Sequence, residues 1–139
     1  MARGEEWRIQ EPLAALLDRW LDPTTTWWTE VDTVCPSALV GMLRRRRGVK
    51  AGTPDVLVFD RGKLIGIELK TRKGRPSESQ EAARGRLLAA EADWWLARSP
   101  GAAMEALRRA GVVSRVIPPP HRAPRCSACP PRHRGNRRT

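Results

Sequence analysis

The stretch that decides the fold is residues 52–70, GTPDVLVFDRGKLIGIELK. It holds two runs rich in apolar residues, Asp55–Phe59 and Leu64–Leu69, separated by the turn-forming sequence DRGK, and this pattern predicts a β-hairpin. Residues 56–59 are continuously apolar, which is typical of a strand that is covered on both faces. We therefore expect the hairpin to lie in a sheet that helices cover.

The register of this hairpin brings three charged residues together. If Arg61-Gly62 forms a two-residue turn, counting outward places Asp55 opposite Glu68, with their β-carbons roughly 5 Å apart. Lys70 lies two residues beyond Glu68 on the same strand and therefore shares its face. A bulged turn would shift the pairing by one residue, and the three side chains would still cluster.

Two carboxylates and a lysine on one face of otherwise apolar strands need an explanation, because like charges repel and burial raises that cost. A bound Mg²⁺ or Mn²⁺ would remove the repulsion, since hard cations take carboxylate oxygens, and the backbone carbonyl of Leu69 could be a further ligand. In phosphodiester hydrolysis, Lys70 would orient a water or stabilise the pentavalent transition state. The alternative is a cross-strand salt bridge between Lys70 and one acid, with the other acid at the rim.

The residues before the hairpin predict one helix and one strand. Pro12 leaves two alternatives for the helix, which either begins at this proline or is joined there, at a kink, to a preceding turn. Asp22-Pro23 ends the helix, and Trp27–Val31 is a β-branched and aromatic strand. Cys35–Thr53 is expected to be a connection. The helix is predicted by apolar residues at helical spacing: Ile9, Leu13, Leu16, Leu17 and Trp20.

The residues after the hairpin predict two helices and two strands. Ser77–Glu91 is a helix whose first turn has the capping-box spacing, with Gln80 three residues after the serine. Asp93–Arg98 is a strand, Pro100–Ala110 a helix and Val112–Ile117 an edge strand. The sequence therefore predicts an α/β domain, one mixed β-sheet flanked by helices, over residues 1–117.

The charge balance indicates a polyanionic partner. The chain of 139 residues has 26 Lys and Arg against 15 Asp and Glu, a formal net charge of +11, which favours association with nucleic acid. A high arginine content from GC-rich coding sequence is the alternative reading. The residues expected to contact nucleic acid are Arg44, Arg45, Arg46, Arg47, Lys50, Arg72 and Lys73.

The C-terminal segment, residues 118–139, is rich in Pro and Arg and has almost no large apolar residues, so a disordered basic tail is expected. Its His121, Cys126, Cys129 and His133 have a metal-like spacing. The segment lacks the hydrophobic residues of a zinc knuckle and a second CxxC, which argues against zinc. Three cysteines suit a reducing cytoplasm, and no apolar run is long enough to span a membrane.

The spacing of the charged cluster also resembles a known signature. Gly52-Thr53-Pro54-Asp55, twelve residues and then Glu68-Leu69-Lys70 resemble the PD-(D/E)xK nucleases. With the following LIGIELKTRKGRPSESQ and WWLARSPGAAMEAL, the likeness is to the VRR-NUC branch found in phage and bacterial proteins, and it covers about Gly48–Val112, nearly half of the chain. It implies a restriction-endonuclease-like fold, Mg²⁺-dependent cleavage of DNA and a tendency to dimerise. We therefore expect a DNA endonuclease or nickase, with duplex, flap, branched and single-stranded DNA as alternative substrates.

Carried over by position, the resemblance makes Asp55 and Glu68 metal ligands and Lys70 the catalytic lysine. Gln80 matches the family's helix glutamine, which faces the site. The family often adds an acid from the first helix, and here both Glu6 and Glu11 are candidates. A non-catalytic nucleic-acid-binding module that keeps the nuclease fold is the rival interpretation, although such a module has no use for paired carboxylates beside phosphate.

Overall fold

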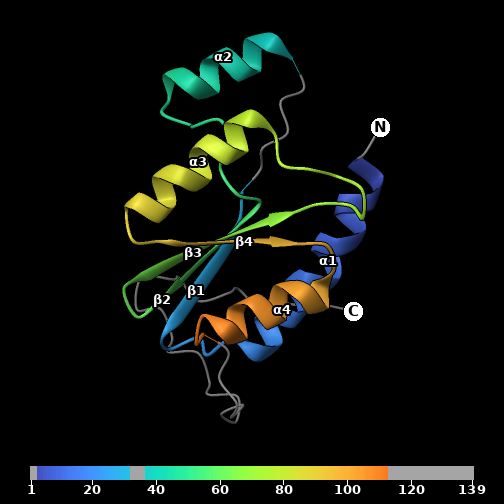
Figure 1. Cartoon of the computed structure of the whole chain (residues 1–139), viewed down its shortest axis with the longest axis vertical. Coiled ribbons are helices and arrows are strands. Elements are labelled where there is room, and N and C mark those ends of the chain that lie inside the picture. Colours follow the sequence, from blue (N-terminus) through green and yellow to red (C-terminus); the bar gives the residue numbers. More distant parts are fainter. Residues whose placement is uncertain (1–2, 32–36, 113–139) are drawn as a thin grey trace, which may run out of the picture.

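The computed structural model describes residues 3–31 and 37–112, and within them four strands form one mixed sheet in the order β1-β2-β3-β4 (Figure 1). The strands are β1 (Thr26–Glu30), β2 (Val56–Asp60), β3 (Lys63–Leu69) and β4 (Asp93–Ala97). The first three are antiparallel, and β4 runs parallel to β3. The helices are α1 (Arg3–Trp20), α2 (Ala38–Arg46), α3 (Glu78–Ala89) and α4 (Pro100–Arg109).

The predicted hairpin register is confirmed. Asp60 pairs with Lys63 across a two-residue turn, and the ladder continues to Val56 opposite Ile67. Arg61 and Gly62 have φ angles of 46° and 84°, as a primed turn requires. One further step along this ladder puts Asp55 opposite Glu68, so the turn and the alternation of residues together fix the position of the two acids.

One face of the sheet carries the hydrophobic core. Alternate residues of the strands point to this face, where α1 and α4 pack together and cover it (Figure 1). The core residues are Leu13, Leu17, Leu21, Val56, Val58, Ile65, Ile67, Leu69, Ala97, Ala103, Leu107 and Val112. Asp60 is buried at the end of this face, where its carboxylate accepts hydrogen bonds from Thr26 Oγ1 at 2.8 Å and Arg61 Nε at 3.0 Å.

The opposite face carries the acids and is covered by α3. This helix begins after Ser77, whose hydroxyl accepts a hydrogen bond from the Gln80 backbone N–H, and Arg84 lies over the ring of Trp94 in β4. Gly66 of β3 leaves room for this packing, since a β-carbon there would meet Pro54 Cγ at 2.7 Å and Leu87 Cδ1 at 3.6 Å. The helix thereby fixes the segment before Asp55 against the sheet.

At Gly52, the addition of a single methyl group should disrupt the packing of this segment against α3 most strongly. Its φ is +79°, and a β-carbon would lie 2.0 Å from the backbone oxygen of Ser79, where α3 begins. Because the clash is with backbone, we expect Gly52→Ala to lower the free energy of unfolding by about 3 kcal/mol. Gly62→Ala is the matched control, with φ +84° and no neighbouring atoms within 4 Å, and should lose about 1 kcal/mol. Urea denaturation of both variants measures the difference, and equal losses would contradict the proposed contact.

The prediction for the first helix was wrong at Pro12. The helix does not begin there; α1 runs from Arg3 to Trp20 with the proline inside it. A proline removes one backbone hydrogen bond, but Pro12 is exposed, and Ile9 and Leu13 on either side pack into the core. Burial on both sides of the proline holds the two halves in one helix.

The connection predicted for residues 35–53 contains a helix, α2. Ser37 caps it by accepting a hydrogen bond from the Val40 N–H at 3.2 Å, and its last turn holds Arg44, Arg45 and Arg46. Arginine favours helices, and its charge suits the negative end of the helix dipole. Arg47 is the C-cap residue. The helix lies away from the sheet, beyond α3 (Figure 1). The helical spacing of Leu39 and Leu43 was the signal available for it.

Two other expectations differ from the structure or lie beyond it. Residues 56–59 are not covered on both faces, because Phe59 is 42% exposed on the face of α3. The predicted edge strand from Val112 to Ile117 and the tail with its His and Cys residues lie outside the described residues, apart from Val112. Of the helices that the structure describes, none has the length and apolar character needed to cross a membrane.

Candidate active site

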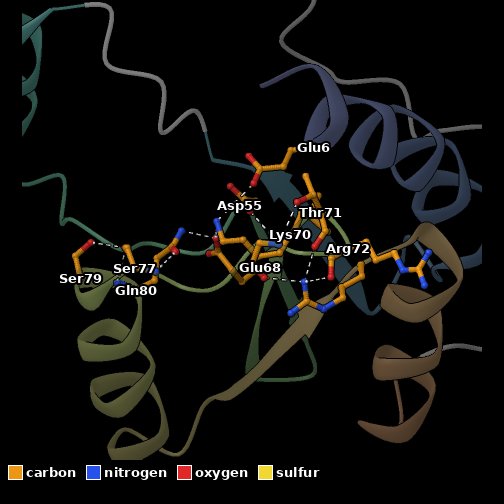
Figure 2. Close-up of polar contacts among 12 residues, drawn as sticks. Glu6, Asp55, Glu68, Lys70, Thr71, Arg72, Ser77, Ser79 and Gln80 are labelled. Atoms are coloured by element: carbon orange, nitrogen blue, oxygen red, sulfur yellow. Dashed lines mark hydrogen bonds and ion pairs between the residues drawn. The ribbon is translucent and has the colours of Figure 1, made fainter. Parts of the chain in front are cut away.

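Five of the predicted residues meet at one end of the sheet (Figure 2). Asp55 directly precedes β2, Glu68 is the last residue but one of β3, and Lys70 follows β3. Gln80 comes from the first turn of α3, and Glu6 comes from the first half of α1. The sheet, the helix on one face and a helix from the other side therefore each contribute a polar side chain to the same place.

Glu68 lies at the centre of the cluster and is completely buried. Its Oε1 accepts a hydrogen bond from Gln80 Nε2 and is 2.9 Å from Lys70 Nζ. Its Oε2 is also buried and has no hydrogen-bond partner among the described residues. A buried carboxylate oxygen without a hydrogen bond is costly, and the interaction with Asp55 that affects the pKa of both acids places that carboxyl beside it.

Asp55 is the second acid and faces Glu68. Its Oδ2 accepts a hydrogen bond from the backbone N–H of Leu69 at 2.8 Å, and its own backbone oxygen accepts one from the Val31 N–H. The carboxylate is therefore held across the two strands. Both acids lie in the cluster, where Lys70 Nζ is 2.9 Å from Glu68 Oε1.

Burial raises the pKa of both carboxyls. Burial raises the pKa of Glu68 to about 7, with the negative charge of Asp55 as the next cause, and the neighbouring Lys70 opposes the rise. Burial also raises the pKa of Asp55, against the hydrogen bond from the Leu69 amide. The negative charge is thus incompletely balanced even with a lysine beside it.

Lys70 is held as a cation. Burial alone would lower its pKa, but the hydrogen bond to Glu68 and the charges of Glu68, Glu6 and Asp55 raise it above its ordinary value. The ammonium lies 3.6 Å from Glu6 Oε1. A lysine in this state donates hydrogen bonds and offsets negative charge, and it does not accept a proton.

The ion pair with Lys70 also distinguishes Glu6 from Glu11 as the acid that α1 contributes to the site. Glu6 reaches the cluster, and its side chain is 33% exposed. Glu11 is exposed on α1, and none of the ion pairs of the described residues involves it. Of the two acids, the structure brings Glu6 to the site.

Gln80 has both of the roles that its position suggested. Its Oε1 accepts a hydrogen bond from the Ser77 backbone N–H at 2.7 Å, which completes the capping box of α3. Its Nε2 donates to Glu68. Because the cap fixes which end of the amide is the acceptor, the NH₂ group is left to orient the carboxylate of Glu68.

Arg98 belongs to the same region and was missed from the sequence. It follows β4, and its Nη1 donates to the backbone oxygen of Thr71 and to those of Arg72 and Gly74 at 3.3 and 2.7 Å. It therefore ties down the turn after Lys70, which carries the exposed Arg72 and Lys73. The parallel pairing of Leu69 with Ala97 places Arg98 beside Lys70, so the signal was available once β4 was aligned with β3.

The residues predicted to contact nucleic acid fall into two groups. Arg72 and Lys73 lie in the turn next to the cluster, and Lys50 is exposed before the Gly52 segment. Arg44, Arg45, Arg46 and Arg47 lie at the C-terminal end of α2, away from the sheet (Figure 1). The structure brings Arg72 and Lys73 next to the cluster, Lys50 lines a cavity between α3 and the hairpin, and the four arginines form a separate basic region.

The chemistry of the donors fits a hard divalent cation. The unpartnered Glu68 Oε2 and the carboxylate of Asp55 are oxygen donors of the kind that Mg²⁺ and Mn²⁺ prefer. In the part of the chain that the structure describes, no three His, Cys, Asp or Glu side chains are grouped so as to hold a metal by themselves. The remaining ligands would therefore come from the main chain, water and a substrate.

The sheet order, the antiparallel hairpin with a parallel fourth strand, and the acids at its end define a restriction-endonuclease-like α/β fold. More narrowly, the fold is similar to that of a solved structure described as a VRR_NUC domain protein, with a TM-score of 0.59 at 16% sequence identity. That similarity covers 76% of this chain and 86% of the other. No family model and no curated protein matches the sequence. The chain therefore has a nuclease-like fold, shown by structure rather than by sequence.

Proposed function

We propose that this protein is a divalent-metal-dependent DNA endonuclease or nickase that hydrolyses phosphodiester bonds. The observation that carries the proposal is the buried Glu68, which has one oxygen without a partner, next to a second acid and a protonated lysine. Such an oxygen can accept a ligand that the protein itself does not supply. The similarity to a structure described as a VRR_NUC domain protein supports the same conclusion, as does the position of the cluster at one end of the sheet.

In this proposal, Asp55 and Glu68 hold Mg²⁺ or Mn²⁺, together with the backbone carbonyl of Leu69. When bound, the cation supplies Lewis-acid activation of the reacting phosphate and of water. Lys70 donates hydrogen bonds to the attacking water or to the phosphate oxygens, where its positive charge offsets the charge that develops in the transition state. Glu6 keeps that ammonium in place, and Gln80 orients Glu68.

The basic residues bind the DNA backbone. Arg72 and Lys73 are next to the cluster and would contact phosphates close to the scissile bond, in a turn that Arg98 holds. Lys50 and the arginines of α2 would contact phosphates farther along. Dimerisation on DNA is part of the proposal, and α2 supports it because Leu39 and Leu43 are 61% and 46% exposed there. Light scattering with and without DNA tests this part.

The test of the proposed function combines cleavage with binding. Linear, branched and nicked DNAs should be cut with Mg²⁺ or Mn²⁺ and left intact with EDTA. Ca²⁺ should promote DNA binding without efficient cleavage, because its looser coordination positions the attacking water poorly. Asp55→Asn should abolish cleavage and the effect of Ca²⁺ on affinity, and should keep the salt-sensitive binding by the basic residues.

The control is Asp93→Asn, in a strand of the same sheet, where the acid pairs with Lys63 away from the cluster. It should cleave as the parent does. If parent and Asp55→Asn have equal DNA affinities with and without Ca²⁺, and no DNA is cut with Mg²⁺ or Mn²⁺, the nuclease proposal fails. A nucleic-acid-binding module with a nuclease-like fold would then be the better interpretation.

A further inference from the structure

The face of the sheet that carries the acids is only partly covered by α3. At its uncovered end, Trp27 of β1 pairs with Phe59 of β2, and their ring centroids lie 5.7 Å apart at an angle of 46°. These side chains are 60% and 42% exposed. Phe59 and Asp55 are four residues apart on one strand and therefore point to the same face. Two large aromatic rings on an open sheet face are expected to have a binding partner.

Apolar side chains lie on the sheet face between this aromatic pair and the candidate active site. Phe59 is about 13 Å along β2 from Asp55, and Leu57 lies between them on the same face. Leu57 also lines a cavity of about 440 Å³ between α3 and the hairpin, which extends to Pro54, the neighbour of Asp55. A second hollow of about 350 Å³ lies beside Trp27 and Phe59. A strand bound at the site would therefore have a path along this surface.

The charges on this path favour an anion with flat apolar groups. Lys50 and Arg86 line the first cavity and are exposed, and none of the ion pairs formed by the described residues involves either of them. Arg61 lines the second hollow. An unpaired nucleotide strand has both properties, because its phosphates are anionic and its base faces are free to stack on aromatic rings. The bases of a duplex are already stacked and do not offer those faces.

We propose that Trp27 and Phe59 form a stacking site for unpaired bases of the DNA strand held at the acids, with Lys50 and Arg86 binding the phosphates between. The inference rests on the proposed function, since it assumes DNA at the candidate active site. It assigns Trp27 and Phe59 to substrate binding outside the reacting cluster, and it makes DNA with an unpaired segment the substrate class that this surface selects.

The test compares two DNAs, a blunt duplex and the same duplex with a single-stranded overhang, by fluorescence anisotropy in Ca²⁺. Trp27→Ala should weaken binding of the overhang DNA by about 5- to 100-fold, the loss expected for one stacked base, and leave the blunt duplex unchanged. Trp27→Phe should keep most of the affinity. Leu88→Ala, an exposed apolar residue on α3 (48% exposed), is the control and should have no effect.

Salt dependence separates stacking from charge. Trp27→Ala should not change the slope of log affinity against log salt concentration, because stacking releases no counterions, whereas Lys50→Ala with Arg86→Ala should make the slope shallower. Equal losses for both DNAs, or no loss for either, would overturn the stacking site. So would a parent dimer that Trp27→Ala splits, because a second copy would then cover this face. These experiments measure binding alone. The stacking site can therefore be confirmed for a protein that does not cleave DNA, and it can be overturned for a protein that does.

Discussion

Lys70→Met should reduce DNA cleavage by about 100- to 1000-fold, the size of effect found when one preorganised donor to a transition state is removed. The lysine is held as a cation by Glu68 and Glu6, and methionine keeps most of its apolar stem while removing the charge. DNA binding in Ca²⁺ should change much less, because the ammonium acts on charge that develops during the reaction. Single-turnover cleavage and equilibrium binding give the two quantities.

The structure also predicts a cost in stability for this substitution. Lys70 is the cation closest to a fully buried carboxylate, and removal of one partner of a buried pair costs about 3 kcal/mol. The double variant Lys70→Met with Glu68→Gln should recover that stability and stay inactive. This comparison separates the loss of the lysine's charge from a loss of folded protein.

Lys63→Met is the matched control for Lys70→Met. Lys63 is in the same strand, and its ammonium is 2.7 Å from Asp93, in a half-exposed pair away from the cluster. Exposed pairs of this kind contribute little to stability, so this variant should fold and cleave as the parent does. The catalytic assignment is wrong if Lys70→Met, once stable, cuts at the rate of the parent, or if Lys63→Met loses as much activity.

The hairpin and the cluster at its end could be predicted because they depend on residues close in sequence. The DRGK turn and the alternation of residues fix the register, and the register brings Asp55 to Glu68. The capping role of Gln80 is also local, whereas its place beside the acids was implied by the resemblance to the VRR-NUC branch. Glu6 could be only one of two candidates, because its place depends on how the whole of α1 packs, and Pro12 obscured that helix.

The features that sequence did not predict depend on contacts between distant elements. The helix α2 is short and lies away from the sheet, and its apolar residues Leu39 and Leu43, although at helical spacing, are exposed. Arg98 acts on the turn after Lys70 only because β4 lies parallel to β3. Phe59 is exposed because α3 covers only part of the sheet face. An apolar run in the sequence does not predict the extent of that cover.

Glu68→Gln should make the protein more stable near pH 8 and abolish cleavage. Burial raises the pKa of Glu68 to about 7 from its ordinary value of 4.5, so between these pH values the folded protein binds a proton that the unfolded chain has released. The free energy of unfolding of the parent therefore falls as the pH rises from about 4.5 to about 7, and the loss persists above that range. A glutamine is neutral throughout and avoids the loss.

The substitution preserves the neighbouring contacts, so the gain in stability can be attributed to the charge. The glutamine oxygen can still accept from Gln80 and Lys70, and its NH₂ group would occupy the place of the unpartnered Oε2, beside the carboxylate of Asp55. At pH 8 the melting temperature should rise by roughly 5 °C or more, and near pH 4.5 parent and variant should agree. Glu11→Gln, an exposed acid of α1, is the control and should show no such pH-dependent difference.

At pH 8, Mg²⁺ should make the melting temperature of the parent higher than that of Glu68→Gln. The same measurement therefore tests the metal site as well as the pKa of Glu68. The cation binds the charged form of Glu68, so it should raise the melting temperature of the parent at pH 8 and leave Glu68→Gln nearly unchanged. Binding to the parent should release close to one proton near pH 6 and almost none at pH 8.5, measured by calorimetry in buffers of different ionisation enthalpy. A melting-temperature difference that is constant across pH would show that the pKa of Glu68 is not raised. An equal response of both proteins to Mg²⁺ would show that Glu68 is not a metal ligand. If Glu68→Gln is more stable than the parent but loses cleavage and the response to Mg²⁺, the charge of Glu68 lowers the stability of the folded protein and is retained because the reaction requires it.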